Sequence, residues 1–215
     1  HHAHCSALLS LANWLAKQTA ATVGFLGEAA NTVGAQVAGA LPLRGGLHTQ
    51  AMLHSPQVKA MVLLNNEPAD DCAQAYEAMK SLATKDMVIT LSPFKANMAF
   101  SDVLLPVSPF SETAGTFINT EGRAQSFHGV VRPLGETRPA WKVLRVLANM
   151  LGVSGFDYDT VEQIRADVLL PDWSSLLSNA CDQSMTQLPV VAHAPETARI
   201  YQLDGLVRRA PSLQQ

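Results

Sequence analysis

Three short runs of apolar residues in the middle of the chain predict β-strands. They cover residues 61–64, 87–91 and 103–107, and the first two runs are typical of strands buried on both faces of a sheet. The first two runs start 26 residues apart, close to the roughly 30 residues of a strand–helix–strand unit with a right-handed crossover. The pattern predicts an α/β fold: an open, mainly parallel, Rossmann-like sheet with flanking helices.

Helical periodicity surrounds these runs. Apolar residues spaced three and four apart predict helices, with Asp70 and Thr160 as N-caps. Between residues 110 and 129, glycines separate short extended stretches, which predicts a β-hairpin-like excursion. The predicted helices cover residues 7–17, 70–82, 139–151 and 160–170, and β-like runs at 22–26 and 200–206 complete the picture.

The elements suggest two parts. Residues 1–152 are predicted to form an incomplete α/β domain. Residues 153–215 are predicted to form a helical and loop-rich extension that packs on it, with a chain end that looks cut.

Composition adds a prediction about the surroundings of the chain. Only 15% of its 215 residues are charged, against about 25% in an average soluble domain. We therefore expect other protein to cover part of its surface. The net charge of −3 argues against a general nucleic-acid binder, which is usually basic.

The charge is nevertheless uneven. Five positive residues and one negative residue, Glu136, fall between residues 123 and 145. Two interpretations stay open: a solvated face, or a patch that meets an acidic partner or a phosphate ligand. The positive residues are Arg123, Arg132, Arg138, Lys142 and Arg145.

Motifs for catalysis and for metal binding are missing from the sequence. Three distant cysteines, Cys5, Cys72 and Cys181, argue against a disulfide framework, a zinc site or an iron–sulfur cluster within this chain. No nucleophile elbow, P-loop or dinucleotide fingerprint occurs, and no apolar stretch is long enough for a membrane span. We therefore predict no catalytic residue and no metal ligand here.

Two places could bind a ligand. Ligands of open parallel sheets bind beyond the carboxyl ends of the strands, where this chain has polar or turn-forming exits at 65–67, 92–94 and 108–110. The second place is residues 116–125, where Arg123 could grip a phosphate or carboxylate. The alternatives are ordinary loops and an internal Glu121–Arg123 or Asn-turn network that shapes the excursion.

Two ordered blocks carry a family resemblance. Residues 100–106 (FSDVLLP) and 112–125 (ETAGTFINTEGRAQ) resemble a signature of the molybdopterin oxidoreductase superfamily. Within it, residues 24–46, 63–68 (LLNNEP) and 91–95 (LSPFK) are similar to the branch formed by the large iron–sulfur subunit of bacterial respiratory complex I.

This resemblance implies a function for the parent protein. The chain would be a structural scaffold in the peripheral arm of an NADH:quinone oxidoreductase, without catalytic residues of its own. Iron–sulfur clusters (2Fe-2S and 4Fe-4S) elsewhere in the parent would carry electrons from NADH to quinone. The alternative implied function is part of an active molybdopterin-dependent oxidoreductase that binds a pterin guanine dinucleotide.

The resemblance also implies site residues, partners and a location. The implied partners are other peripheral-arm subunits and the missing N-terminal part of the same chain, with no nucleic acid and no direct membrane insertion. The implied location is cytoplasmic, peripheral to the inner membrane. The residues that match the cofactor-binding positions of relatives, as a vestigial site, are Asn65, Asp102, Asn119, Glu121, Gly122 and Arg123.

Overall fold

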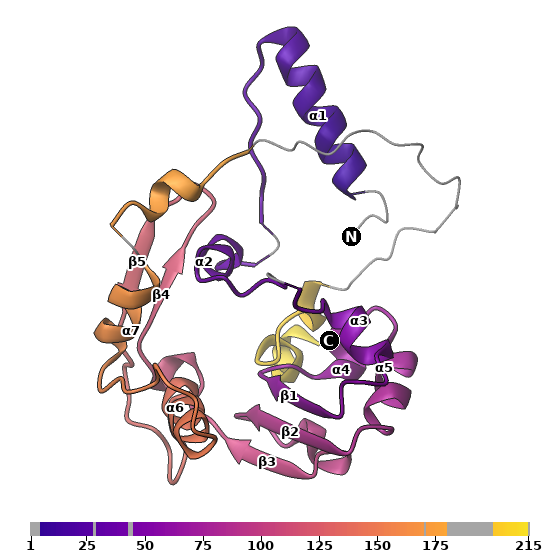
Figure 1. The fold of residues 1–215 in the computed structure, drawn as a ribbon, viewed down its shortest axis with the longest axis vertical. Coiled ribbons are helices and arrows are strands. Elements are labelled where there is room, and N and C mark those ends of the chain that lie inside the picture. The colour runs from indigo at the N-terminus through magenta and orange to yellow at the C-terminus, as the bar shows by residue number, and fades with distance from the viewer. Residues whose placement is uncertain (1–4, 28, 43–44, 170, 180–199, 215) are drawn as a thin grey trace. The chain divides into compact units, whose positions relative to one another are not determined.

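The computed structural model describes residues 5–27, 29–42, 45–169, 171–179 and 200–214 (Figure 1). The chain divides into two compact units. One combines His1–Ala29 with Asp172–Gln215, and the other is the continuous segment Ala30–Pro171. The division predicted between residues 152 and 153 stays a prediction.

A three-stranded parallel sheet is the centre of the continuous unit. Its strands are β1 (Ala60–Leu64), β2 (Met87–Ser92) and β3 (Val103–Pro106), in the order β1-β2-β3. In register, Leu64 lies opposite Leu91 and Val103 opposite Ile89. The α/β fold with a parallel sheet is thus confirmed, and the arrows lie side by side in Figure 1.

Burial of the sheet is less complete than predicted. The middle strand β2 is mostly buried, with Val88, Thr90 and Leu91 nearly inaccessible. Strand β1 alternates instead: Met61 and Leu63 are buried, whereas Val62 and Leu64 are exposed. The prediction of burial on both faces is therefore wrong for β1, because an apolar run looks the same whether or not this chain covers its second face.

Two helices cover the buried face of β1. They are α3 (Thr49–His54) and α5 (Ala75–Leu82), and Ser81 in α5 donates a hydrogen bond to the Leu53 carbonyl in α3. Burial of apolar surface is the main stabilising contribution of such a cluster. Its buried residues are Met61, Leu63, Leu82 and Val88, with Met52, Leu53, Val58, Met79 and Phe100 packed against them.

The helix predicted over residues 70–82 is interrupted. A single turn, α4 (Pro68–Asp71), starts earlier, because Pro68 suits the first helical position. The Asp71 carboxylate accepts from the Glu67 amide at 2.6 Å, and Cys72 turns to an extended conformation before α5 begins. Asp70 therefore lies inside α4 and does not cap the longer helix.

The predicted hairpin is present. Strands β4 (Gly115–Ile118) and β5 (Ala124–Phe127) are antiparallel, and the rings of Phe117 and Phe127 meet edge to face at 5.3 Å. Helix α2 (Thr32–Val37) is tied to this hairpin, because the Asn31 side-chain oxygen accepts from the Ile118 amide at 2.9 Å.

Two further helices follow the hairpin within the same unit. Helix α6 (Ala140–Met150) matches the predicted segment 139–151. Helix α7 (Val161–Val168) has Thr160 as N-cap, as predicted, in a capping box completed by Gln163.

In the other unit, the regular elements of the described residues are all helices. It contains α1 (Cys5–Thr19) and short 3-10 helices, and the Asn179 side chain donates to the Val23 carbonyl at 2.8 Å. The strand-like runs predicted at 22–26 and 200–206 are wrong: the first is irregular and the second begins with a 3-10 turn. Among the described helices, none has the length and apolar character needed to cross a membrane. The 3-10 helices among the described residues of both units are η1 (Ala96–Ala99), η2 (Phe110–Glu112), η3 (Trp173–Leu176), η4 (Ile200–Gln202), η5 (Val207–Arg209) and η6 (Pro211–Leu213).

Candidate functional site

Polar residues gather where the parallel strands end. Asn65 follows β1 in a left-handed conformation, with φ of 49°, and Glu67 just beyond it is buried. Ser92 ends β2, and its buried hydroxyl accepts from the Phe94 amide at 3.0 Å. Ser108 lies two residues beyond β3 and is also buried. The predicted strand exits therefore do form one polar edge of the sheet.

The side chain of Asn97 stabilises this edge of the sheet through hydrogen bonds. Its side chain is buried and donates to the Asn66 carbonyl at 2.8 Å and to the Thr90 hydroxyl at 3.4 Å. The Thr90 hydroxyl in turn lies 2.7 Å from that of Ser101. Sequence analysis missed Asn97; an amide in a short, otherwise mostly apolar stretch was the available signal.

Asp102 lies at the opposite edge of the sheet from Asn65. Its carboxylate accepts from the Val88 amide at 2.7 Å, and its own amide donates to the Val88 carbonyl. By register, four residues separate the two positions along the strands, which is about 13 Å at 3.3 Å per residue. Asp102 therefore sets the register of β3 against β2 at the amino end of the sheet.

The other four predicted residues lie together in the β4–β5 turn. The Asn119 side-chain oxygen accepts from the amides of Glu121 and Arg123, at 3.1 and 2.9 Å. Gly122 has φ of 77°, in the left-handed region that favours glycine. The sequence left open whether a Glu121–Arg123 network or an Asn-turn network shapes the excursion. The structure contains the Asn-turn network. The Glu121 and Arg123 side chains are exposed.

The six predicted residues thus occupy three places in the fold. Asn65 is at the carboxyl edge of the sheet, Asp102 is at its amino edge, and residues 119–123 form the hairpin turn. The Asp102 carboxylate is directed at the backbone of β2. The role of the six residues toward a cofactor remains a prediction.

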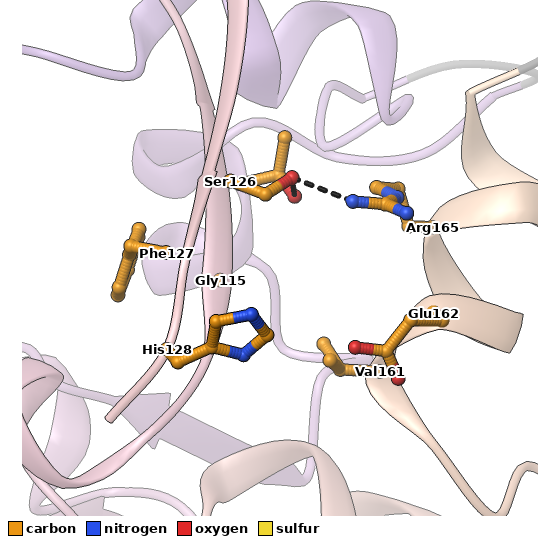
Figure 2. A pocket seen from close by; sticks show the side chains of 8 residues that line it. Gly115, Ser126, Phe127, His128, Val161, Glu162 and Arg165 are labelled. Atoms are coloured by element: carbon orange, nitrogen blue, oxygen red, sulfur yellow. Dashed lines mark hydrogen bonds between the residues drawn. The ribbon is translucent and has the colours of Figure 1, made fainter. Parts of the chain in front are cut away.

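A polar hollow of about 220 Å³ lies between the hairpin and α7. Figure 2 shows His128 and Glu162 on opposite sides of it, with Arg165 donating to the Ser126 hydroxyl at 2.7 Å. The pKa of Glu162 is lowered, first by a hydrogen bond from its own backbone amide, then by Thr160, Arg165 and His128. An activated serine nucleophile needs a general base within hydrogen-bond reach of its hydroxyl. The described partners of the Ser126 hydroxyl are Arg165 and the Thr116 hydroxyl, at 2.7 and 2.9 Å, and neither is a base.

Metal-binding chemistry has no support in the described ranges. No group of three or more histidine, cysteine or acidic side chains there could hold a metal ion. Cys72 is a free thiol, and its pKa is raised first by burial and then by the neighbouring Asp71 carboxylate. A raised pKa keeps the thiol protonated and unreactive.

An α/β protein with polar residues at the carboxyl ends of parallel strands is of the kind that binds nucleotide-like groups. The chain belongs to the molybdopterin oxidoreductase family, whose family model matches residues 1–150. This establishes the broader of the two resemblances.

Individual relatives agree with that family. Over 128 residues the chain is 34% identical to "Probable oxidoreductase YjgC" of Bacillus subtilis (strain 168), covering 55% of this chain and 12% of the relative. Over 85 residues it is 39% identical to "Putative formate dehydrogenase SAB2186c" of Staphylococcus aureus (strain bovine RF122 / ET3-1), covering 40% and 8%. The chain therefore spans about a tenth of the length of these relatives.

A solved structure is also similar. Acetylene hydratase from Pelobacter acetylenicus shares 26% identity at a TM-score of 0.44, over 50% of this chain and 16% of the hydratase. Neither name of the two sequence relatives refers to respiratory complex I, so the narrower resemblance stays a proposal.

Proposed function

We propose that this chain is a structural, non-catalytic part of a molybdopterin-family oxidoreductase. This proposal rests on one observation: side chains that the sequence predicted to bind a cofactor form hydrogen bonds within the fold. The Asp102 carboxylate and the Asn119 amide oxygen both accept hydrogen bonds from backbone amides. Side chains used in this way hold strands and turns in place, and the chemistry belongs to groups elsewhere in the parent.

Our first candidate for the parent is the large iron–sulfur subunit of a respiratory complex I. Three sequence blocks, at 24–46, 63–68 and 91–95, support it through their resemblance to that subunit. The exposed apolar side chains of Val62 and Leu64 on β1 suit a chain covered by neighbouring protein. In this proposal, clusters outside the chain carry electrons from NADH to quinone, in the cytoplasm at the inner membrane.

The second candidate is an active molybdopterin-dependent oxidoreductase. The comparisons favour it over the first at this level of detail, because a relative is named as a formate dehydrogenase. A pterin guanine dinucleotide would then be held mainly by segments outside this chain, and the exposed Arg123 guanidinium would be available to one of its phosphates.

Analysis of the intact parent protein separates the two candidates. We expect a complex I subunit to contain iron, to lack molybdenum and pterin fluorescence, and to support NADH:quinone activity in its complex. Stoichiometric molybdenum with fluorescent pterin would establish the second candidate and reject the first. Elemental analysis and pterin fluorescence after oxidation of the purified protein measure both quantities.

Arg123→Ala tests the structural role directly. If the hairpin turn is only structural, electron transfer by the assembled parent should stay within about twofold of wild type, a change of about 0.4 kcal/mol in the barrier. Lys80→Ala, at another exposed cation, is the matched control. Loss of activity in a fully assembled Arg123→Ala protein would contradict the proposal and assign Arg123 to a ligand.

A further inference from the structure

Three of the five cations found between residues 123 and 145 gather at one hollow. Arg132, Arg138 and Lys142 line an open hollow of about 500 Å³, which we call the basic hollow. Arg123 lies in the β4–β5 turn instead, and Arg145 is engaged with Asp159 at 3.4 Å. Three cations that are spread along the sequence therefore form one local positive surface in the structure.

Nearby carboxylates do not cancel this charge. Glu112 also lines the hollow, and its carboxylate accepts from the Leu134 amide at 3.0 Å. Glu136 pairs with Arg138 at 3.5 Å, but both side chains are largely exposed, and such pairs contribute little. Three cations thus face two carboxylates, one of them held by a backbone amide.

The start of α6 adds to the positive potential. Its N-cap is Pro139, a hollow-lining residue without a side-chain acceptor for the first helical amides. The positive end of a helix dipole therefore stays uncapped by any side chain beside Lys142. The positive potential of the hollow comes mainly from the three cations, and the helix N-terminus adds to it.

Exposed apolar side chains lie on the same loop as Arg132, and we call these residues the apolar rim. Val130, Val131 and Leu134 belong to the loop that carries Arg132, and they are 82%, 58% and 77% exposed. A small inorganic anion would make no favourable contact with such apolar side chains. Protein interfaces, in contrast, combine apolar residues with arginine at their centres.

The loop is held in place before any partner arrives. The Val130 amide donates to the Ser111 carbonyl at 2.8 Å, and the Ser108 amide donates to the Arg138 carbonyl at 2.9 Å. The Thr137 hydroxyl donates to the Leu134 carbonyl at 2.8 Å. A preorganised surface loses less conformational entropy on binding.

We propose that the basic hollow and its apolar rim form the docking surface for an acidic segment of a partner polypeptide. Aspartate or glutamate carboxylates of that segment pair with Arg132, Arg138 and Lys142, and its aliphatic side chains cover the exposed valines and Leu134. This inference rests on the proposed structural role in an assembly, and it names the chemistry of one partner.

Zero-length cross-linking in the intact complex tests the contact. A carbodiimide joins a lysine amine only to a carboxylate in direct contact, so we expect Lys142 to link to an aspartate or glutamate of another polypeptide. Lys142→Arg keeps the charge and removes the reactive amine, so this link should disappear while the complex stays assembled. If Lys142 forms no link to another polypeptide while other lysines react, the proposal is overturned.

Charge reversal tests the energetics. The triple variant Arg132→Glu, Arg138→Glu, Lys142→Glu should bind the cross-linked partner about tenfold or more weakly. Its matched control, Lys59→Glu, Lys80→Glu, Lys95→Glu, reverses three exposed cations elsewhere in the same unit and should bind normally. Unchanged partner affinity in the first triple, measured by titration of the purified parent, would overturn the proposal.

Failure of this inference can be told apart from failure of the proposed function. A parent that transfers electrons normally with Arg123→Ala but shows no Lys142 cross-link would leave the structural role standing without this partner. A cross-linked parent that loses activity with Arg123→Ala would keep the docking surface and reject the structural role.

Discussion

Replacing Gly129 by alanine is expected to destabilise the unit formed by residues 30–171. A β-carbon at Gly129 would lie 2.9 Å from the Glu112 carbonyl carbon and 3.0 Å from the Thr113 nitrogen. Both atoms belong to the backbone, so the clash cannot be relieved by a side-chain rotation. The adjacent hydrogen bond from Val130 to Ser111 would have to shift. Overpacking of this kind costs about 1–3 kcal/mol.

Thermal unfolding measures this cost. For a chain of this size, a loss of about 2 kcal/mol lowers Tm by roughly 4–8 °C. Gly24→Ala is the matched control, because a β-carbon there has no atom within 4 Å. An unchanged Tm for Gly129→Ala would mean that the backbone segments at residues 112 and 129 do not approach each other as described.

Local signals in the sequence predicted most secondary structure. The apolar runs located all three parallel strands, the glycine pattern located the β4–β5 hairpin, and Thr160 located the start of α7. Each of these signals lies within a few residues of the element it specifies. The break between α4 and α5 was missed because the Asp71 carboxylate turns back to the Glu67 amide, and an acidic residue there equally suits a helix N-cap.

Contacts between distant segments account for what the sequence did not reveal. The hydrogen bond from Ile118 to Asn31 joins residues 87 positions apart, and nothing in either local pattern specifies it. In the sequence, Asp102 lies beside an apolar strand, as a ligand-binding residue would. Its carboxylate accepts a hydrogen bond from the Val88 amide only once β2 and β3 are paired. The positions of candidate site residues therefore depended on strand register, which local sequence patterns leave open.

Replacing Asn97 by aspartate is expected to have a comparable or larger effect, through charge rather than size. The Asn97 side chain is 4% exposed and donates to the Asn66 carbonyl and the Thr90 hydroxyl. An ionised carboxylate has no proton to donate to either oxygen, and its charge would be buried against the carbonyl. Loss of a buried donor costs about 1–3 kcal/mol, and more where a charge is left unpaired. Denaturant unfolding at neutral pH should show this loss.

The pH dependence of this loss identifies the buried charge as its cause. Burial raises the pKa of the introduced carboxyl in the folded state above its unfolded value of about 3.9. The folded state then holds the proton more tightly, so the penalty grows as pH rises from about 4 through the folded-state pKa, and it fades below about 4. Asn149→Asp, at an exposed position of α6, makes the same exchange and should cost less than about 1 kcal/mol. A penalty for Asn97→Asp that does not change with pH would point to lost hydrogen bonds alone, and equal penalties at both positions would contradict the burial of Asn97.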